Sequence, residues 1–173
     1  ALLLVKMGRL YHTKDENSKS LEYFDKALKI FEQFDDKNGI MAVQFYKGRI
    51  YFDQNDKSKS LVSFKKALEI SQDVKYQEAI AEIAEEIGDV YKGMGYLNIP
   101  VEHYKQALNI IQEVGNDPKE GDILYTIGQL YSGMGDYKKA LEALNKAIQI
   151  YKDQNSMVEN GEVLVEIGKV NSN

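Results

Sequence analysis

The sequence contains no cysteine, no tryptophan, and only two prolines and two histidines in 173 residues. Without cysteine the chain forms neither disulfides nor thiolate metal sites. His12 and His103 occupy non-equivalent positions, and no cluster of His, Asp and Glu has the spacing of metal ligands. We therefore predict a protein without metal, cofactor or catalytic residues.

Long apolar runs and positive charge are also scarce. The run from Leu2 to Val5 is too short to span a membrane, and no cleavable signal is recognisable. The net charge is −5, and residues 81–120 alone carry that much negative charge. An acidic chain is poorly suited to neutralising nucleic-acid phosphates. We predict a cytoplasmic protein with neither a membrane nor a nucleic acid as partner.

What the sequence does contain is a strict repeat of 40 residues. The recurring positions are Gly8, Gly48, Gly88, Gly128 and Gly168, then Tyr11, Tyr51, Tyr91 and Tyr131, then Ala27, Ala67, Ala107 and Ala147. A period of this size indicates stacked supersecondary units rather than a globule with one centre. The expected repeats are about 1–40, 41–80, 81–120 and 121–160, with a half-repeat at 161–173, all in one domain over 1–173.

Each block carries two apolar stripes with helical spacing, separated by a polar break. The predicted helices span about 1–14 and 17–34, about 39–54 and 57–74, about 77–94 and 98–114, and about 118–134 and 137–153, followed by one helix at about 158–171. We therefore predict an all-α protein built from helix pairs. Gly93-Met94-Gly95 and Gly133-Met134-Gly135 fall between paired helices and are interpreted as turns, not phosphate-binding loops.

The recurring glycine predicts close helix packing. Because glycine has no Cβ, Gly8 and its equivalents allow the paired helix to approach, at a cost of about 1 kcal/mol in helix propensity. Small residues at Ser20, Ser60 and Ala140 are expected to meet that approach from the other helix. Phe24 and its equivalents would fill the adjacent space.

The residues Asp136-Tyr137-x-x-Ala140-Leu141 and Lys146-Ala147-Ile148-x-Ile150 resemble the tetratricopeptide repeat, as does Leu108 in the third block. The repeat is six residues longer than the standard unit, similar to leucine-glycine-asparagine-repeat scaffolds, kinesin light chains and bacterial peptide-sensing regulators. The resemblance implies a right-handed α-solenoid superhelix of four antiparallel helix pairs plus one terminal helix. It also implies a concave groove that holds a partner.

Two blocks depart from the pattern near the start of a helix. Pro100 occupies the place of Ser20, and Asn98 is a candidate N-cap that would start this helix one or two residues late. Asp117-Pro118-x-Glu120 is typical of a cap, an N1 proline and a capping-box acid that open the next helix.

The second block places polar Gln44 and Lys47 where the other blocks carry mostly apolar residues. Two interpretations remain open. Either this helix is rotated about its axis, or Lys47 extends along apolar neighbours to reach water.

Positions 2, 5, 9, 12 and 13 of each block cluster about 130° from the core stripe of the first helix. In the resembled family that face lines the groove. The candidate partner-binding residues on this face, with Lys6 and Glu86 flanking it, are Lys6, Arg9, His12, Phe45, Arg49, Phe52, Glu82, Glu85, Glu86, Asp89, Tyr125 and Gln129. The lining is expected to be bipolar, basic and aromatic in the first two blocks and acidic in the third. The alternative is that these charges simply form a solvated helix face. Like charges this close on one helix cost roughly 0.2–0.5 kcal/mol per pair, which invites a functional interpretation without proving one.

The leading hypothesis is a non-catalytic interaction module that binds a peptide or helical segment in this groove. The alternative is a regulatory peptide-sensing domain of a larger signalling or transcription protein. A third hypothesis is self-association through an open N-terminal edge, where apolar Leu2 and Leu3 begin at full repeat register. We expect the chain to be a module of a longer protein. Val5 and Glu82 replace basic residues of the family's carboxylate clamp, so we predict no chaperone tail as partner.

Overall fold

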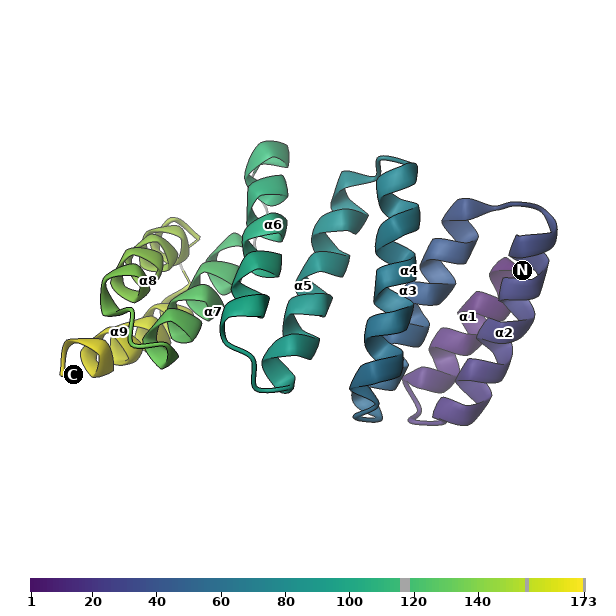
Figure 1. Cartoon of the computed structure of the whole chain (residues 1–173), viewed down its shortest axis with the longest axis horizontal. Helices are drawn as coiled ribbons and strands as arrows, with labels where there is room; N and C mark the ends of the chain where they lie inside the picture. The colour runs from purple at the N-terminus through teal and green to yellow at the C-terminus, as the bar shows by residue number, and fades with distance from the viewer. Residues whose placement is uncertain (116–118, 155, 173) are drawn as a thin grey trace. The chain divides into compact units, whose positions relative to one another are not determined.

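The computed structural model describes residues 1–115, 119–154 and 156–172. These described residues form nine helices and no strand, and the chain divides into two compact units, Ala1–Val90 and Tyr91–Asn173 (Figure 1). The all-α prediction is confirmed. The predicted helix ends agree with the observed ones to within two residues. The extent of one domain over 1–173 stays a prediction.

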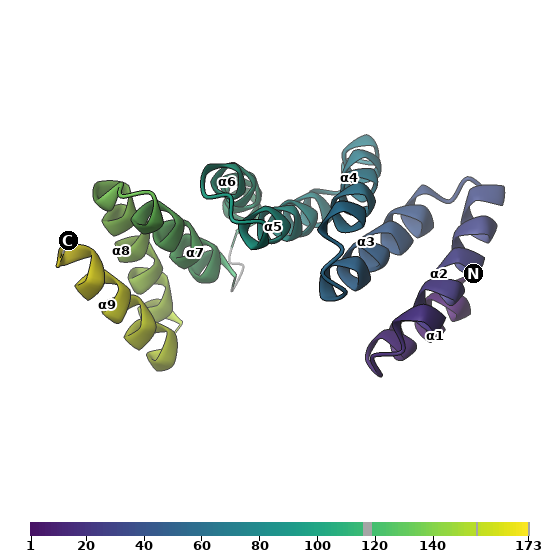
Figure 2. The ribbon, with the colours of Figure 1, turned by 60° about the horizontal axis from the view of Figure 1, so that its bottom comes forward.

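Unit 1 contains two antiparallel helix pairs and most of a fifth helix. The helices are α1 (Leu2–His12), α2 (Asn17–Gln33), α3 (Lys37–Asp53) and α4 (Lys57–Asp73), followed by α5 (Gln77–Gly93), whose last turn enters unit 2. α2 packs against both α1 and α3, α3 packs against α4, and α1 also contacts α3 (Figure 2).

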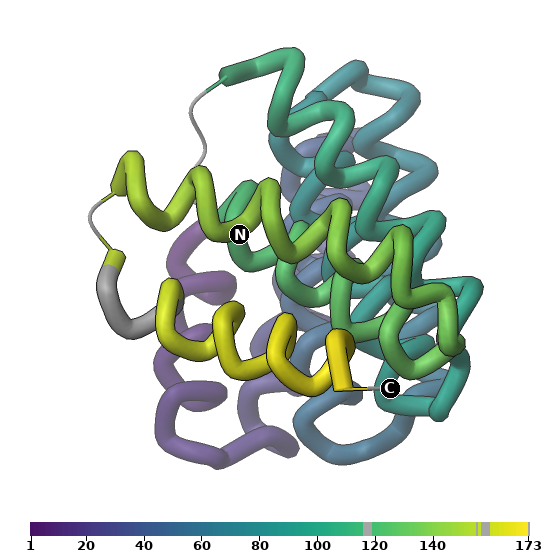
Figure 3. Tube along the Cα trace, turned by 90° about the vertical axis from the view of Figure 1, so that its left-hand side faces the viewer, coloured from purple at the N-terminus to yellow at the C-terminus, as the bar shows by residue number. Residues whose placement is uncertain are grey.

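Unit 2 follows the same plan with one helix fewer at its start, because α5 lies mainly in unit 1. It contains α6 (Asn98–Val114), α7 (Glu120–Gly133), α8 (Tyr137–Asp153) and α9 (Met157–Asn171). α7 contacts α6, α8 and α9, and α8 lies beside α9 (Figure 3).

The glycine contact predicted inside each helix pair is confirmed in three repeats. A Cβ added at Gly8, Gly48 or Gly128 would lie 2.9, 2.6 or 2.7 Å from a side chain of the paired helix. The sequence analysis missed a polar element of this contact. The Ser20 hydroxyl donates to the Gly8 carbonyl at 2.7 Å, and Ser60 repeats the bond with Gly48 at 2.9 Å.

A residue with positive φ recurs every 20 residues, directly after a helix. Side-chain-bearing residues hold φ between 50° and 59° at Asp15, Asp35, Asn55 and Lys75, and glycines hold φ between 75° and 86° at Gly95, Gly115 and Gly135. At six of these seven positions the following backbone N–H closes the helix end, as where the N–H of Asp56 donates to the Tyr51 carbonyl at 2.8 Å. Gly95 and Gly135 are thus turn glycines, as predicted.

Lys75→Gly is expected to raise the free energy of unfolding by about 0.5–1 kcal/mol. The left-handed backbone at Lys75, with φ of 56°, costs a side-chain-bearing residue roughly 1–2 kcal/mol, and glycine removes this cost. Glycine also gives the unfolded chain more conformational freedom, which offsets part of the stabilisation. Denaturant unfolding followed by circular dichroism measures the change. Gly135→Ala is the reverse control, because no atom lies within 4 Å of its added Cβ and only the backbone opposes it. Equal midpoints for both variants and the wild type would contradict the strain argument.

The two interpretations of α3 are now distinguished. The buried residues of α3 occupy the same repeat positions as those of α5. They are Met41, Val43, Gln44, Gly48 and Ile50, matching Ala81, Ile83, Ala84, Gly88 and Val90. The helix is therefore not rotated. Lys47 stands at the position of Ile87, is 15% exposed, and donates from Nζ to Asp25 Oδ1 at 2.7 Å.

The late start of α6 is confirmed, but the predicted cap is wrong. α6 begins at Asn98, one residue later in the repeat than α4 and α8, and Leu97 precedes it without a side-chain cap. The side chains of Asp36, Asp56 and Asp136 cap their helices by accepting from the N–H at the third helical position, and in α6 that position is Pro100, which has no N–H. The predicted cap Asp117 and N1 proline Pro118 lie outside the described residues, and α7 begins at Glu120.

Candidate partner-binding groove

Unit 1 contains a pocket of about 440 Å³ formed by α1, α3, α5 and the turn before α5. Its lining residues are Arg9, Met41, Ala42, Phe45, Tyr46, Arg49, Tyr76, Glu78, Ala79, Glu82 and Ile83. Four of them were predicted as site residues: Arg9, Phe45, Arg49 and Glu82. We call these lining residues, together with Glu86, the arginine groove.

Both arginines of this groove lie over aromatic rings. The Arg9 guanidinium carbon is 5.1 Å from the centre of the Tyr46 ring, and that of Arg49 is 6.0 Å from the centre of the Phe45 ring. Arg49 Nε also lies 3.5 Å from Glu86 Oε1 on α5. The basic and acidic parts of the predicted lining therefore meet within unit 1, through a pair that holds Arg49 between a ring and a carboxylate.

Burial raises the pKa of the Glu86 carboxyl to about 7. The Arg49 charge opposes this rise in pKa, while Asp89, Glu85 and Glu82 on the same helix add to it. The Glu86 side chain is 21% exposed. The groove therefore contains a carboxyl group that titrates near neutral pH, where small changes in its surroundings alter its charge.

The remaining predicted residues of unit 1 lie outside the pocket. His12 is half-buried and its Nε2 is 2.7 Å from Asp53 Oδ2 on α3, so it links α1 to α3. Lys6 is exposed and Phe52 is half-buried. Glu85 and Asp89 are half-buried on α5 beside Glu86.

In unit 2, Tyr125 and Gln129 lie together on α7. Burial raises the pKa of the Tyr125 hydroxyl, as do the carboxylates of Glu166 and Glu162 on α9, while a hydrogen bond with Gln129 lowers it. This pair is thus beside α9, and it forms no part of the arginine groove.

The sequence analysis missed Tyr46, Tyr76 and Glu78 as groove residues. Tyr76 and Glu78 lie in and just after the turn between α4 and α5, which a search along helix faces leaves out. Tyr46 follows Phe45 directly, and its ring stacks on Phe24 at 5.6 Å between centroids. The unusual run of two aromatic residues in the second block was the available signal.

The family model of the tetratricopeptide repeat matches residues 1–73 and 79–153. The chain belongs to the tetratricopeptide repeat family. Domains of this family are generally non-catalytic interaction scaffolds. A search of curated proteins finds no match.

Solved structures share the tetratricopeptide fold with this chain. Aspartyl phosphate phosphatase F from Bacillus subtilis aligns with a TM-score of 0.86 at 16% identity, over 94% of this chain and 43% of that one. A Rap protein complexed with Competence and Sporulation Factor aligns with a TM-score of 0.77 at 18% identity, over 96% of this chain and 50% of that one. A STAND protein with a tetratricopeptide repeat sensor from Pyrococcus horikoshii aligns with a TM-score of 0.83 at 21% identity, over 95% of this chain and 26% of that one. The chain thus spans half or less of each of these proteins.

No helix in the described part of the chain combines the length and apolar character that crossing a bilayer requires. No group of three or more His, Asp or Glu residues among the described ones is arranged to hold a metal ion.

Proposed function

We propose that this chain is a non-catalytic protein–protein interaction module that holds a peptide or helical segment in the arginine groove. One observation carries the proposal. Three aromatic rings, two arginines and exposed acids converge on one pocket from α1, α3, α5 and the adjoining turn. Aromatic residues and arginine supply most of the binding free energy at protein interfaces, and charges at the rim select the partner.

The partner expected from this lining is a segment with both acidic and basic side chains. Its acidic side chain would approach Arg9 and Arg49, and its basic side chain would approach Glu78 and Glu82. Neither a nucleic acid nor a membrane is expected as partner, and a cytoplasmic location suits this role. Self-association through the N-terminal edge, where Leu2 is 73% exposed, stays a prediction.

A regulatory peptide-sensing role is the second candidate. The Rap protein complexed with Competence and Sporulation Factor and the STAND protein with a repeat sensor support it, because each combines this fold with further sequence. In that role the same groove would bind the peptide, and an attached domain would respond. A DNA-binding or enzymatic domain in the longer protein would favour this candidate.

Affinity capture with the chain as bait, followed by binding measurements on the recovered partner, tests the groove. We expect Phe45→Ala to weaken binding by about 2 kcal/mol, roughly thirtyfold, as for an interface hot spot. Glu82→Lys is expected to alter the salt dependence of association. Glu142→Lys on α8 is the matched control, because it reverses an exposed charge in unit 2. Wild-type affinity and salt dependence in both groove variants would refute the assignment, provided circular dichroism shows them folded.

A further inference from the structure

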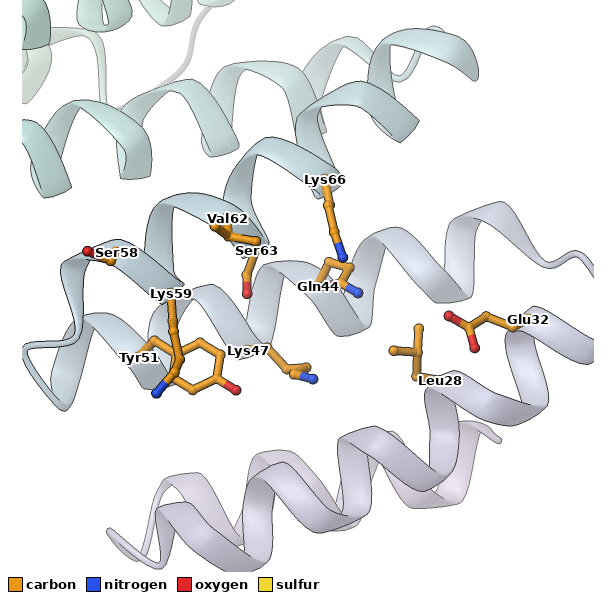
Figure 4. Close-up of a pocket in the computed structure, with 10 residues that line it drawn as sticks. All are labelled: Leu28, Glu32, Gln44, Lys47, Tyr51, Ser58, Lys59, Val62, Ser63 and Lys66. Carbon is orange, nitrogen blue, oxygen red and sulfur yellow. The ribbon is translucent and has the colours of Figure 1, made fainter.

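A second pocket of unit 1 lies between α2 and α4, over α3 (Figure 4). Its volume is about 420 Å³, and α3 contributes Gln44, Lys47 and Tyr51 to it. These side chains lie on a different face of α3 from Phe45 and Arg49 of the arginine groove. We call this pocket and its continuation, described below, the α2–α4 groove.

Two polar side chains in this pocket are buried without a partner. Gln44 is 8% exposed and Ser63 is 5% exposed, yet within the described residues neither side chain takes part in a hydrogen bond. Figure 4 shows both at the pocket, with Lys66 extending from α4 toward Gln44. Their polar atoms are not among the fully buried unpaired ones of the described residues, so they face the pocket, where a ligand can hydrogen-bond to them.

The chain itself shows that the fold does not require these polar residues. A pocket of about 270 Å³ occurs at the equivalent repeat positions in unit 2. There, Gln44 and Ser63 correspond to Leu124 and Ala143. Lys66 corresponds to Lys146, so the cation is common to both pockets, whereas the buried polar pair is specific to the α2–α4 groove.

The groups around Gln44 are mainly hydrogen-bond donors. The Ser63 hydroxyl, the Gln44 amide and the Lys66 ammonium can all donate, and Lys66 has no ion pair among the described residues. Val62 also lines the pocket, where the other repeats carry glutamate at 22, 102 and 142. Glu32 is the one acid in the pocket lining. A site with several hydrogen-bond donors and few acidic side chains nearby is suited to binding a carboxylate.

The pocket continues along the groove rather than ending at Gln44. An adjoining pocket of about 470 Å³ shares Glu32, Gln44 and Lys66 with it. The far end is acidic, with Asp35 and Glu69 among its lining residues. A groove of this length with opposite charges at its ends fits an extended chain better than a single small anion.

We propose that the α2–α4 groove is a second binding site, for an extended peptide segment. An acidic side chain of the peptide is bound by Gln44, Ser63 and Lys66, and a basic side chain further along it lies against Asp35 and Glu69. This site is separate from the arginine groove and does not depend on it.

The test uses a fluorescein-labelled peptide with one glutamate and one lysine separated by two serines. Its binding to the full chain is measured by fluorescence anisotropy, and its location by the side-chain amide signals of Gln44 in NMR. The comparison peptide carries glutamine in place of glutamate, and free glutarate serves as competitor. We expect saturable binding of the first peptide, a shift of the Gln44 amide signals, and no binding of the glutamine peptide.

The deciding variant is Gln44→Leu combined with Ser63→Ala, which installs the residues of the fourth repeat and leaves every charge in place. We expect it to weaken peptide binding about tenfold or more, equivalent to about 1.4 kcal/mol, while the chain becomes more resistant to denaturant. Lys66→Gln is expected to weaken binding, whereas Lys146→Gln, its equivalent in unit 2, leaves it unchanged.

Several results would overturn the proposal. Undiminished binding in the double variant, or binding lost equally in Lys146→Gln, would show that general charge attraction holds the peptide. Glutarate binding as tightly as the peptide would assign the pocket to a small anion. No shift of the Gln44 amide signals at millimolar peptide would show that the groove is not a site.

Discussion

Gly48→Ala is expected to lower the free energy of unfolding by about 1–3 kcal/mol, the range seen when extra carbon is forced into a packed core. The added Cβ would lie 2.6 Å from both Cδ1 and Cε1 of Phe64. Phe64 is fully buried and its ring also packs against Phe45, so it has little room to move. The gain of about 1 kcal/mol that alanine brings to a helix offsets only part of this cost.

Gly168→Ala is the matched control, because Gly168 holds the same repeat position and no atom lies within 4 Å of its added Cβ. It is expected to stabilise the chain by up to about 1 kcal/mol, so the two variants differ in sign. Denaturant unfolding, with hydrogen exchange of the α3 amides to localise the effect, measures both. A shift in the same direction for both glycines would contradict the packing account.

A double-mutant cycle sharpens the test. Phe64→Ala alone is expected to cost about 3–5 kcal/mol, as for other buried aromatic rings. It also removes the ring atoms that the methyl group added by Gly48→Ala would meet. In that background Gly48→Ala is expected to become neutral or stabilising, and the coupling between the two sites reports their contact. Additive effects would show that the glycine is needed for some other reason.

The repeat made the local structure predictable. Because a glycine recurs in every repeat and a large side chain (Phe24, Phe64, Tyr104 or Leu144) recurs on the paired helix, one packing argument applied to each helix pair, and helix ends followed from the same register. The hydroxyl of Ser20 shows the limit of this reasoning. Its small size was recognised, but the bond to the Gly8 carbonyl depends on a side-chain direction that spacing alone does not specify.

Contacts between repeats were harder to predict. The polar residues of α3 are equally consistent with a rotated helix and with a lysine that reaches a partner. The difference depends on Asp25, which is 22 positions away on another helix. The cap of α6 was mispredicted because Asn98 is the first residue of the helix and Pro100, at the third helical position, offers no N–H to a cap.

The sequence predicted those residues of the candidate site that share a helix face, but not those that lie in a turn. Arg9, Phe45, Arg49 and Glu82 line one pocket, as expected for residues that share a face of the first helix in each repeat, while their role in binding stays a prediction. Tyr76 was missed because it lies in a turn. The repeat comparison identified Gln44 as an exception, but only the structure shows that its unpaired amide lines a groove.

Glu86→Gln is expected to abolish most of the pH dependence of stability between pH 4.5 and 7. The folded pKa of about 7 lies above the ordinary value of 4.5, so the folded chain holds this proton more tightly than the unfolded chain. The resulting stabilisation is fully present below pH 4.5 and is lost as pH rises through 7. At about 1.4 kcal/mol per pH unit, the loss at pH 8 is at most about 3 kcal/mol.

Glutamine keeps the shape of Glu86 without its charge, so the variant is expected to exceed the wild type at pH 8 by about 2–3 kcal/mol and to match it near pH 4.5. Denaturant unfolding at a series of pH values measures this difference. Glu82→Gln, one turn earlier on α5 and exposed, is the control and is expected to stay within about 0.5 kcal/mol of the wild type. Parallel profiles of stability against pH for the wild type and Glu86→Gln would show that burial does not raise the pKa of the Glu86 carboxyl. A stabilised variant that binds its partner less well would instead indicate that the charged Glu86 is retained to hold Arg49 in the arginine groove, at a cost in stability.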